Sequence, residues 1–196
     1  MNIDEFVRAV ASEPMRVVTL RGRIPTVETL ALASKPGGVS LQDFTSSPAK
    51  VEERHLRFGH VLGSPARPEA IYGWQTKWPS HRLPGDLIAL LERVNGIHLW
   101  ADLDVGRSYL GLAPIEEWNL ARVKMYGSEA DQELLDDRYI ALTYHEDGTS
   151  FVVVDVSSGT YYLMDVAGPD DSTPLGKCVD DLLDWLWKNR IPPPQC

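Results

Sequence analysis

The spacing of apolar residues predicts a short helix with one apolar face near the middle of the chain. Its apolar positions recur at i, i+3, i+4 and i+7, which places them on one side of a 3.6-residue helix. They are Leu87, Leu90, Leu91 and Val94. Pro84 suits the first turn, and Asn95-Gly96 supplies a left-handed stop. The apolar run 97–100 follows at once and predicts a strand, so the helix is expected to cover the sheet that this strand joins.

The strongest strand signal is a meander of three β-branched and aromatic runs, at 139–144, 151–156 and 160–166. Glycine-containing turns of hairpin length separate the runs, so we expect them to pair as antiparallel neighbours. Residues 151–154 are apolar on both alternating faces, and Asp155 then interrupts the apolar run. The middle run is therefore expected to be a central strand with helices over both faces.

The rest of the pattern alternates between less distinct helices and strands. Amphipathic spacing predicts helices at 3–11, 26–34, 115–125 and 179–189, and β-prone runs predict strands at 15–20, 97–102 and 108–112. Gly, Pro and polar interruptions predict turns, loops or irregular segments at 21–23, 46–67, 129–138 and 168–176. Together the elements predict an α+β fold. In it an antiparallel sheet, built from the meander at 139–166 and strands near 97–112, is flanked by helices.

Length and composition are those of an ordinary globular protein. With 196 residues, 43% of them hydrophobic and 24% charged, the chain can bury roughly 70% of its unfolded surface without a disulfide or a metal. No apolar run approaches the roughly 20 residues of a membrane helix, and the acidic start at 1–5 is unlike a secretory signal. Cys178 and Cys196 are too few for a disulfide framework or a cysteine zinc site. We therefore expect a cytoplasmic protein with no membrane partner and no cofactor.

Charge is divided unevenly along the chain. Residues 1–80 carry 10 Lys or Arg against 8 Asp or Glu, whereas residues 81–196 carry 9 against 20, within an overall formal charge of −9. An acidic half repels nucleic acid, whose binding depends largely on Lys and Arg at phosphates. It favours a basic protein partner or simple solubility.

The sequence lacks the usual signatures of an enzyme, because the P-loop, Rossmann and nucleophile-elbow patterns are all missing. His145-Glu146-Asp147 comes nearest to a metal or acid/base cluster, but it falls in a predicted hairpin turn and is interpreted as solvated. Asp155 is interpreted as hydrogen-bonded in the sheet or at its end, since an unpaired buried carboxylate is costly. His98 is interpreted as a partly buried histidine. We therefore expect no enzymatic activity and no metal site.

Two alternatives stay open at this point. The first is a site for a hard divalent cation, as in metal-dependent nucleases, because carboxylate oxygens are the ligands that such ions prefer. Its candidate ligands are Asp102, Asp104, Glu116, Glu117, Asp155 and Asp165. The second is a reactive thiol of lowered pKa at Cys178, which stands at the entry to the last helix.

Acidic residues stand beside aromatic residues at two places that suit a protein-binding surface. Carboxylates speed the encounter with a basic partner, and aromatic anchors fix its register. Trp118 lies on the apolar stripe of its predicted helix, so it is expected to be buried with the neighbouring glutamates exposed. The predicted partner-binding residues are Trp100, Asp102, Asp104, Glu116, Glu117 and Asp147.

The order of these elements resembles the SUKH superfamily, which includes the yeast Smi/Knr-like cell-wall regulators and many bacterial immunity proteins. The matching features are Leu83-Pro84 before the helix that ends at Asn95-Gly96, the run Leu-Gly-Leu-Ala-Pro-Ile-Glu-Glu-Trp at 110–118, Asp155 and Gly159 in the meander, and the closing helix at 179–187. The resemblance covers about 74–190. It implies an α+β fold and a non-enzymatic role in which a bacterial member neutralises a cognate toxin domain, often a nuclease, of a contact-dependent, type VI or polymorphic toxin system.

This reading divides the chain into an N-terminal extension at 1–72, which is expected to pack on the core, a SUKH-like core at 73–191 and a tail at 192–196. Oligomeric state is not predicted. A SUKH-like regulatory scaffold and a carboxylate-metal enzyme are the competing functional hypotheses.

Overall fold

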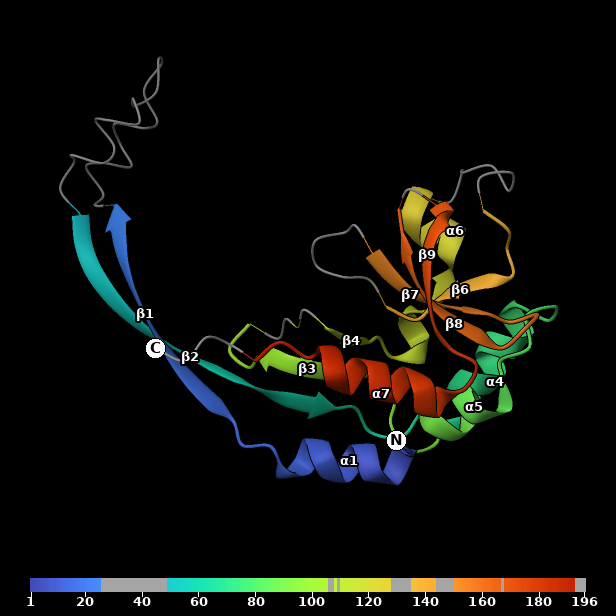
Figure 1. Ribbon diagram of the computed structural model, residues 1–196, viewed down its shortest axis with the longest axis horizontal. Coiled ribbons are helices and arrows are strands. Elements are labelled where there is room, and N and C mark those ends of the chain that lie inside the picture. The colour runs from blue at the N-terminus through green and yellow to red at the C-terminus, as the bar shows by residue number, and fades with distance from the viewer. Residues whose placement is uncertain are drawn as a thin grey trace, which may run out of the picture.

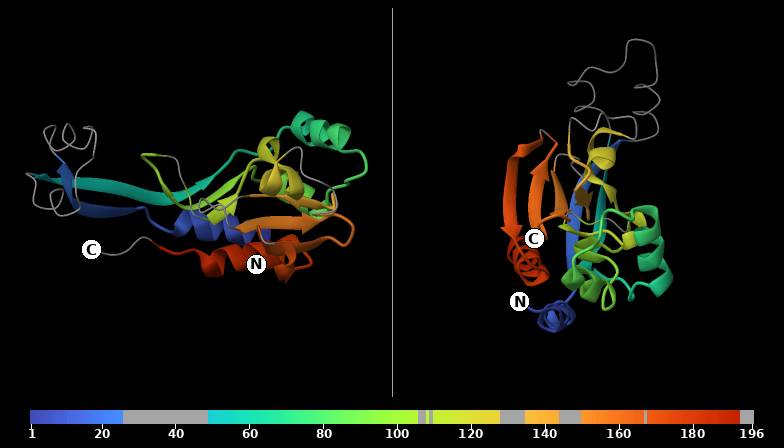
Figure 2. Two further views of the ribbon diagram at one scale, coloured as in Figure 1. Left: turned by 90° about the horizontal axis from the view of Figure 1, so that it is seen from above. Right: turned by 90° about the vertical axis from the view of Figure 1, so that its right-hand side faces the viewer.

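The computed structural model describes residues 1–25, 49–105, 108, 110–127, 135–143, 150–166 and 168–192. It confirms the predicted α+β class, with antiparallel sheets and helices packed around them (Figures 1 and 2). The single sheet expected from the sequence is wrong, because the strand at 97–102 pairs with 58–62 and so belongs to a different sheet from the meander. Sheet A has the order β1 (Arg16–Pro25), β2 (Ala49–Leu62), β3 (Ile97–Asp102) and β4 (Leu110–Leu112). Sheet B has the order β5 (Asn119–Leu120), β6 (Tyr139–Ala141), β7 (Ser150–Asp155), β8 (Thr160–Asp165) and β9 (Gly168–Gly176). The helices are α1 (Ile3–Ser12), α4 (Pro68–Lys77), α5 (Gly85–Leu91), the 3-10 turn η1 (Ile115–Glu117), α6 (Ala121–Tyr126) and α7 (Val179–Asn189).

The central helix lies where the apolar spacing predicts it, although it is shorter than expected. All four predicted positions, from Leu87 to Val94, are buried in the main core. Regular α5 ends at Leu91, and Gly96 adopts a left-handed φ of 106° in the loop that follows. Asn95 Oδ1 accepts a hydrogen bond of 2.8 Å from the Ile115 amide, so this loop also caps the start of η1.

Strand β7 is the central strand that the sequence predicts, buried on both faces between β6 and β8. Val152 and Val154 face the main core with the apolar stripe of α7. Phe151 and Val153 face a second, smaller core beside α6. The two sheets are joined where the Ala113 amide donates to the Leu142 carbonyl at 2.8 Å, one residue beyond β6.

The two terminal helices lie against each other. Helix α1 has the apolar face that the sequence predicts, and Asn2 and Glu5 cap its start reciprocally. Phe6 is fully buried, and its ring meets the Trp187 ring of α7 edge-on with centroids 6.0 Å apart. The first 72 residues thus contribute α1 against α7 and β2 beside β3.

The largest difference from the sequence-based prediction is a long β-hairpin in the N-terminal part. The predicted turn at 21–23 lies inside β1, and the segment 46–67, predicted to be irregular, contains the 14-residue strand β2. Gly22 and Gly59 obscure the alternation, because glycine inside a strand is typical of a break. Cross-strand pairing overrides that weak local preference.

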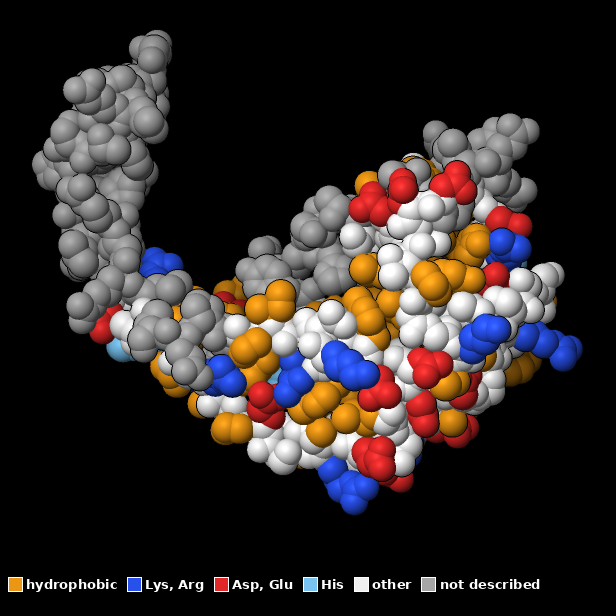
Figure 3. All heavy atoms as spheres, in the orientation of Figure 1, with side chains coloured by type: hydrophobic (Ala, Val, Ile, Leu, Met, Phe, Trp, Pro, Cys, Tyr) orange, Lys and Arg blue, Asp and Glu red, His pale blue; other side chains and the backbone are white. Residues whose placement is uncertain are grey.

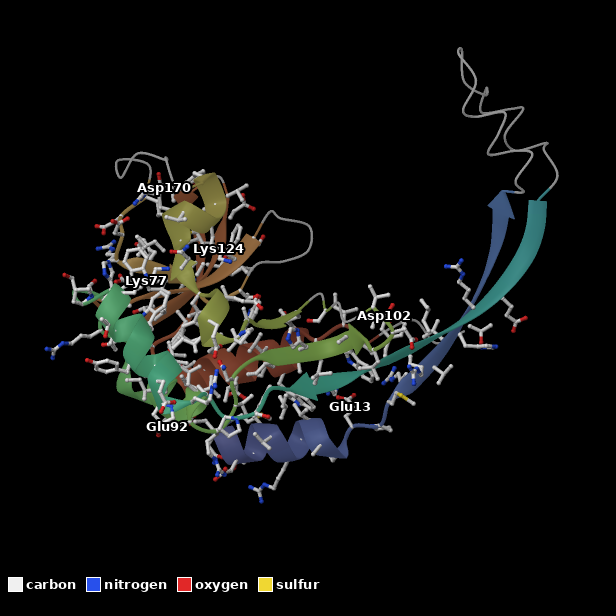
Figure 4. The ribbon with its side chains drawn as sticks, turned by 180° about the vertical axis from the view of Figure 1, so that it is seen from behind. Glu13, Lys77, Glu92, Asp102, Lys124 and Asp170 are labelled. Carbon is white, nitrogen blue, oxygen red and sulfur yellow. The ribbon has the colours of Figure 1, made fainter. Side chains whose placement is uncertain are left out.

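Two C-terminal segments also differ from the prediction. The single helix expected at 115–125 is divided into η1, β5 and α6, because residues 119–120 pair with β6. The loop expected at 168–176 is the edge strand β9, paired with β8. Prolines and aspartates such as Asp170 are typical of an edge strand that must avoid pairing with other chains (Figure 4). The predicted helix at 26–34 and the turn at 146–148 lie outside the described residues.

Alanine substitutions at two glycines, one in the close β3–β4 pairing and one in open space, are expected to have opposite effects on stability. A Cβ at Gly111 would lie 1.8 Å from the Ile97 carbonyl oxygen, whereas a Cβ at Gly85 would meet nothing within 4 Å. Gly111→Ala is therefore expected to lower the free energy of unfolding by more than about 2 kcal/mol. Gly85→Ala at the start of α5 should raise it by about 0.4–1 kcal/mol. Urea denaturation of both variants measures this, and equal effects at the two sites would contradict the assigned β3–β4 register.

Candidate functional site

A two-stranded ribbon projects from sheet A (Figures 1 and 2). Strand β1 pairs with β2 along ten residue pairs, from Arg16 with Phe58 to Pro25 with Ala49, but β3 borders β2 only over 58–62. We call the part beyond the Arg16–Phe58 pair the ribbon, and that pair with its surroundings the root. The ribbon spans roughly 30 Å at about 3.3 Å per residue. No third strand of the described chain pairs with it, and a lone two-stranded ribbon is only marginally stable in water.

One face of the root is braced by the loop after β3. The Leu103 amide donates to the Arg57 carbonyl at 2.8 Å, and the Asp104 carboxylate forms an ion pair with the Arg57 guanidinium. The Arg57 side chain holds the pKa of Asp104 below its usual range, against a small opposing effect of burial. Leu103 lies over Gly59, whose added Cβ would be 3.2 Å from it. This loop therefore fixes the direction in which the ribbon leaves the sheet.

The opposite face of the root carries a cluster of charged and aromatic side chains from five parts of the chain. We call it the terminal junction, because it joins the residue after α1 to the residue after α7. Its members are Glu13, Arg16, His60, Trp100, Trp187 and Arg190. Figure 4 shows Glu13 near the end of α1 and Asp102 at the end of β3, both close to the root.

His60 is at the centre of the terminal junction, and its side chain is only 2% exposed. The backbone amide of Trp100 donates to His60 Nδ1 at 3.1 Å. Because an amide nitrogen can only donate, Nδ1 must be the acceptor and Nε2 must carry the proton. Nε2 then donates to a Glu13 carboxylate oxygen 3.0 Å away. Both ring nitrogens are thus used within the fold, and neither is available as a catalytic base.

The electrostatics of the junction favour a neutral His60 beside an ionised Glu13. Burial is the main cause that lowers the pKa of His60, and Arg190 and Arg16 lower it further, against an opposing effect of Glu13. Burial raises the pKa of Glu13, but hydrogen bonds from Arg190 and His60 bring it below its ordinary value. Arg190 donates to Glu13 at 2.9 Å and lies 3.4 Å from the centre of the Trp187 ring.

Trp100 occupies an unusual backbone conformation at the junction. Its φ of 52° is left-handed, and it is the only such residue other than glycine in the described chain. The β2–β3 register shifts by one residue at this point, so Trp100 lies in a β-bulge. The centre of its ring lies 4.5 Å from that of the tilted His60 ring and 4.6 Å from the Arg16 guanidinium carbon. These contacts offset a conformational cost of about 1–2 kcal/mol.

The structure separates the predicted partner-binding residues into two groups. Asp102 and Asp104 lie at the root, where the Asp102 carboxylate accepts the amides of its own turn. Glu116 and Glu117 are exposed on η1 near the start of β3, six residues or roughly 20 Å away. Trp100 is 3% exposed, so its ring is not presented to a partner.

Trp118, which follows Glu117, is buried, as the sequence predicts. Its indole N–H donates to the Ala113 carbonyl at 2.7 Å. Asp147 lies outside the described residues.

The carboxylates proposed as alternative metal ligands do not converge. Among the residues with described positions, no group of three or more His, Cys, Asp or Glu is placed to hold a metal ion. Asp155 instead accepts the amide and hydroxyl of Ser157, at 2.9 and 2.6 Å. Burial raises the pKa of Asp155, but these bonds and Arg138 bring it below its ordinary value.

The Cys178 thiol does not have the lowered pKa that the reactive-thiol alternative requires. The backbone amide of Asp181 lowers the pKa of Cys178, but burial and the Asp181 carboxylate outweigh it, and the net shift is upward. A raised pKa reduces the thiolate fraction at neutral pH. The direction of this shift does not support the reactive-thiol alternative.

The terminal junction is the part of the site that sequence reasoning missed. His60 and Glu13 are 47 residues apart, and Arg190 and Glu13 are 177 apart, so no local pattern connects them. A histidine within a predicted strand would have been the one sequence signal for this site. The sequence predicts an irregular segment at 46–67, so His60 did not stand out.

Comparison with known proteins adds no family. A scan against protein-family models and a search of curated proteins both found no match to this chain. In the described part of the chain, every helix is too short or too polar to cross a membrane.

The left-handed bulge at Trp100 predicts an inverted order of stability for two substitutions. Removing the buried ring is expected to destabilise both Trp100→Gly and Trp100→Ala by about 3–5 kcal/mol. Glycine tolerates the positive φ and alanine does not, so Trp100→Gly should be the more stable of the two by about 1 kcal/mol. Chemical denaturation measures the difference. If the alanine variant is the more stable, as is usual within a strand, Trp100 is not held in the left-handed region.

Proposed function

We propose that this protein acts by binding another protein, and that the partner is a cognate toxin domain which it neutralises. The observation that carries the proposal is the ribbon, which is fixed at its root and has no supporting strand beyond it within the described chain. An extended strand pair of this kind offers a long contact surface and gains stability when a partner packs on it.

The exposed residues near the root fit a protein contact. Val17 in β1 and Val61 in β2 are 57% and 41% exposed, and Asp102 lies between the ribbon and the body. A standard interface buries about 800 Å² on each partner. An interface of this size centred on the root takes in Asp102 and Asp104 but not Glu116 and Glu117, which lie roughly 20 Å away at the other end of β3.

Charge and resemblance support the toxin as partner. Figure 3 shows many acidic side chains over the body, in keeping with the excess of carboxylates in residues 81–196. Many nucleic-acid-cleaving toxins need a basic surface for phosphate, and an acidic binder complements such a surface. The order of elements between 74 and 190 resembles SUKH immunity proteins, for which a cytoplasmic location and this role are typical.

We expect a toxin domain to be encoded beside this gene, and co-expression with that domain tests the proposal. Wild-type protein is expected to restore growth and to co-purify with the toxin domain at a fixed ratio. Val17→Asp places a charge on the ribbon and should weaken binding at least about tenfold, or about 1.4 kcal/mol. Tyr72→Asp is the matched control, because Tyr72 on α4 is 73% exposed and lies away from the ribbon. It should leave binding unchanged.

The other outcomes separate the competing functions. Failure to bind or rescue against the adjacent toxin would reject the proposal. Several protein partners without rescue would indicate a regulatory scaffold. Tight binding of Mg²⁺ or Mn²⁺ by calorimetry would indicate a carboxylate-metal enzyme instead. Equal loss of binding in the Val17 and Tyr72 variants would place the interface away from the ribbon.

A further inference from the structure

The hydrogen bonds of His60 cannot both survive protonation of its ring. A neutral imidazole has one donor and one acceptor nitrogen, and these match the Glu13 carboxylate and the Trp100 amide. The second proton must enter at Nδ1, which already faces the N–H of Trp100. Two donors then oppose each other in a buried site, whereas the bond to Glu13 can persist. Protonation therefore acts selectively on the β3 side of the junction.

Charged groups reach His60 from each end of the chain. Glu13 follows α1, Arg16 lies in β1 and Arg190 follows α7, while β3 and α7 contribute the Trp100 and Trp187 rings. One carboxylate and two guanidiniums leave an excess of positive charge around the ring. This excess resists the arrival of a further proton at neutral pH.

We propose that the terminal junction is a pH-sensitive clamp on the ribbon. Uptake of a proton at His60 Nδ1 breaks the hydrogen bond from Trp100, releases the strained bulge and loosens β3 from β2 at the root. Glu13 and Arg190 remain paired, so the terminal helices keep their contact while the root opens. This property belongs to the free protein and does not depend on the identity of any partner.

The direction of the pH effect follows from the shift in the His60 pKa. The folded protein binds this proton less readily than the unfolded chain, in which the pKa is about 6.5. The stabilisation is thus complete above about pH 6.5 and is lost as the pH falls through the lower folded-state pKa. The pKa of Glu13 is below its ordinary value, so the proton taken up by the terminal junction in this pH range belongs to His60.

The protection of the Trp100 amide against solvent exchange, measured by NMR from pH 7.5 to 5 and corrected for intrinsic exchange, tests the clamp. Wild-type protection should fall by up to about tenfold for each pH unit from about pH 6.5, where the opened state takes up the proton, down to the lower folded-state pKa of His60. His60→Gln keeps a neutral donor and acceptor and should show no such fall. His98→Gln, in strand β3 with Trp100, is the control and should keep the wild-type response. A flat wild-type profile, or an equal fall in His60→Gln, would overturn the proposal.

A surface variant provides an independent test if His60→Gln does not fold. The Arg16 guanidinium lowers the folded-state pKa of His60, so in Arg16→Gln the loss of protection should be smaller and should end at a higher pH. Arg82→Gln removes an exposed guanidinium elsewhere and should leave the profile unchanged. An unchanged profile in Arg16→Gln contradicts the clamp, since a purely structural role for His60 predicts no dependence on this charge.

Discussion

The short pairing of β2 with β3 is the constraint on which the rest of the structure depends. Over 58–62 a single strand must hold a ribbon that continues roughly 30 Å beyond the sheet. A few backbone hydrogen bonds do not fix the direction of such a lever, because neighbouring strands twist easily. The chain therefore adds contacts on both faces of the root: the Leu103–Asp104 brace on one and the terminal junction on the other.

The terminal junction also explains why the two ends of the chain belong to one fold. Arg190 and His60 share the same Glu13 oxygen, so the segments after α7 and α1 meet at the ribbon's root. The arrangement is buried and polar. Both His60 nitrogens have hydrogen-bond partners in it, whereas the indole nitrogen of Trp100 is buried with none among the described residues. Satisfaction of both His60 nitrogens is what makes Trp100 tolerable in a left-handed bulge. The root is thus held by several contacts, whereas no further strand of the described chain pairs with the ribbon beyond it.

The spacing of apolar residues was sufficient to predict those elements whose buried side chains come from one short stretch of sequence. The stripes of α5 and α7 and the doubly apolar β7 could be predicted because each buries side chains at a regular spacing. The ribbon could not, since Gly22 and the charged residues hide the alternation and its pairing joins segments far apart. Likewise, tryptophan rarely adopts a positive φ, so the conformation of Trp100 could not be predicted locally. It depends on contacts with His60 and Arg16 from other strands.

The proposed function rests on the same asymmetry. Within the described residues the strand pair is held only at its root, and such a pair is suited to contact a partner protein. Hydrogen–deuterium exchange of the free protein at pH 7.5, resolved by peptide, tests this claim most directly. Amides at 58–62 and 97–102 should exchange only through near-global unfolding. Those of the ribbon should exchange on the order of a hundredfold faster, by local opening. Equal protection along the whole length of β1 and β2 would contradict the account, because the ribbon would then need no partner to support it.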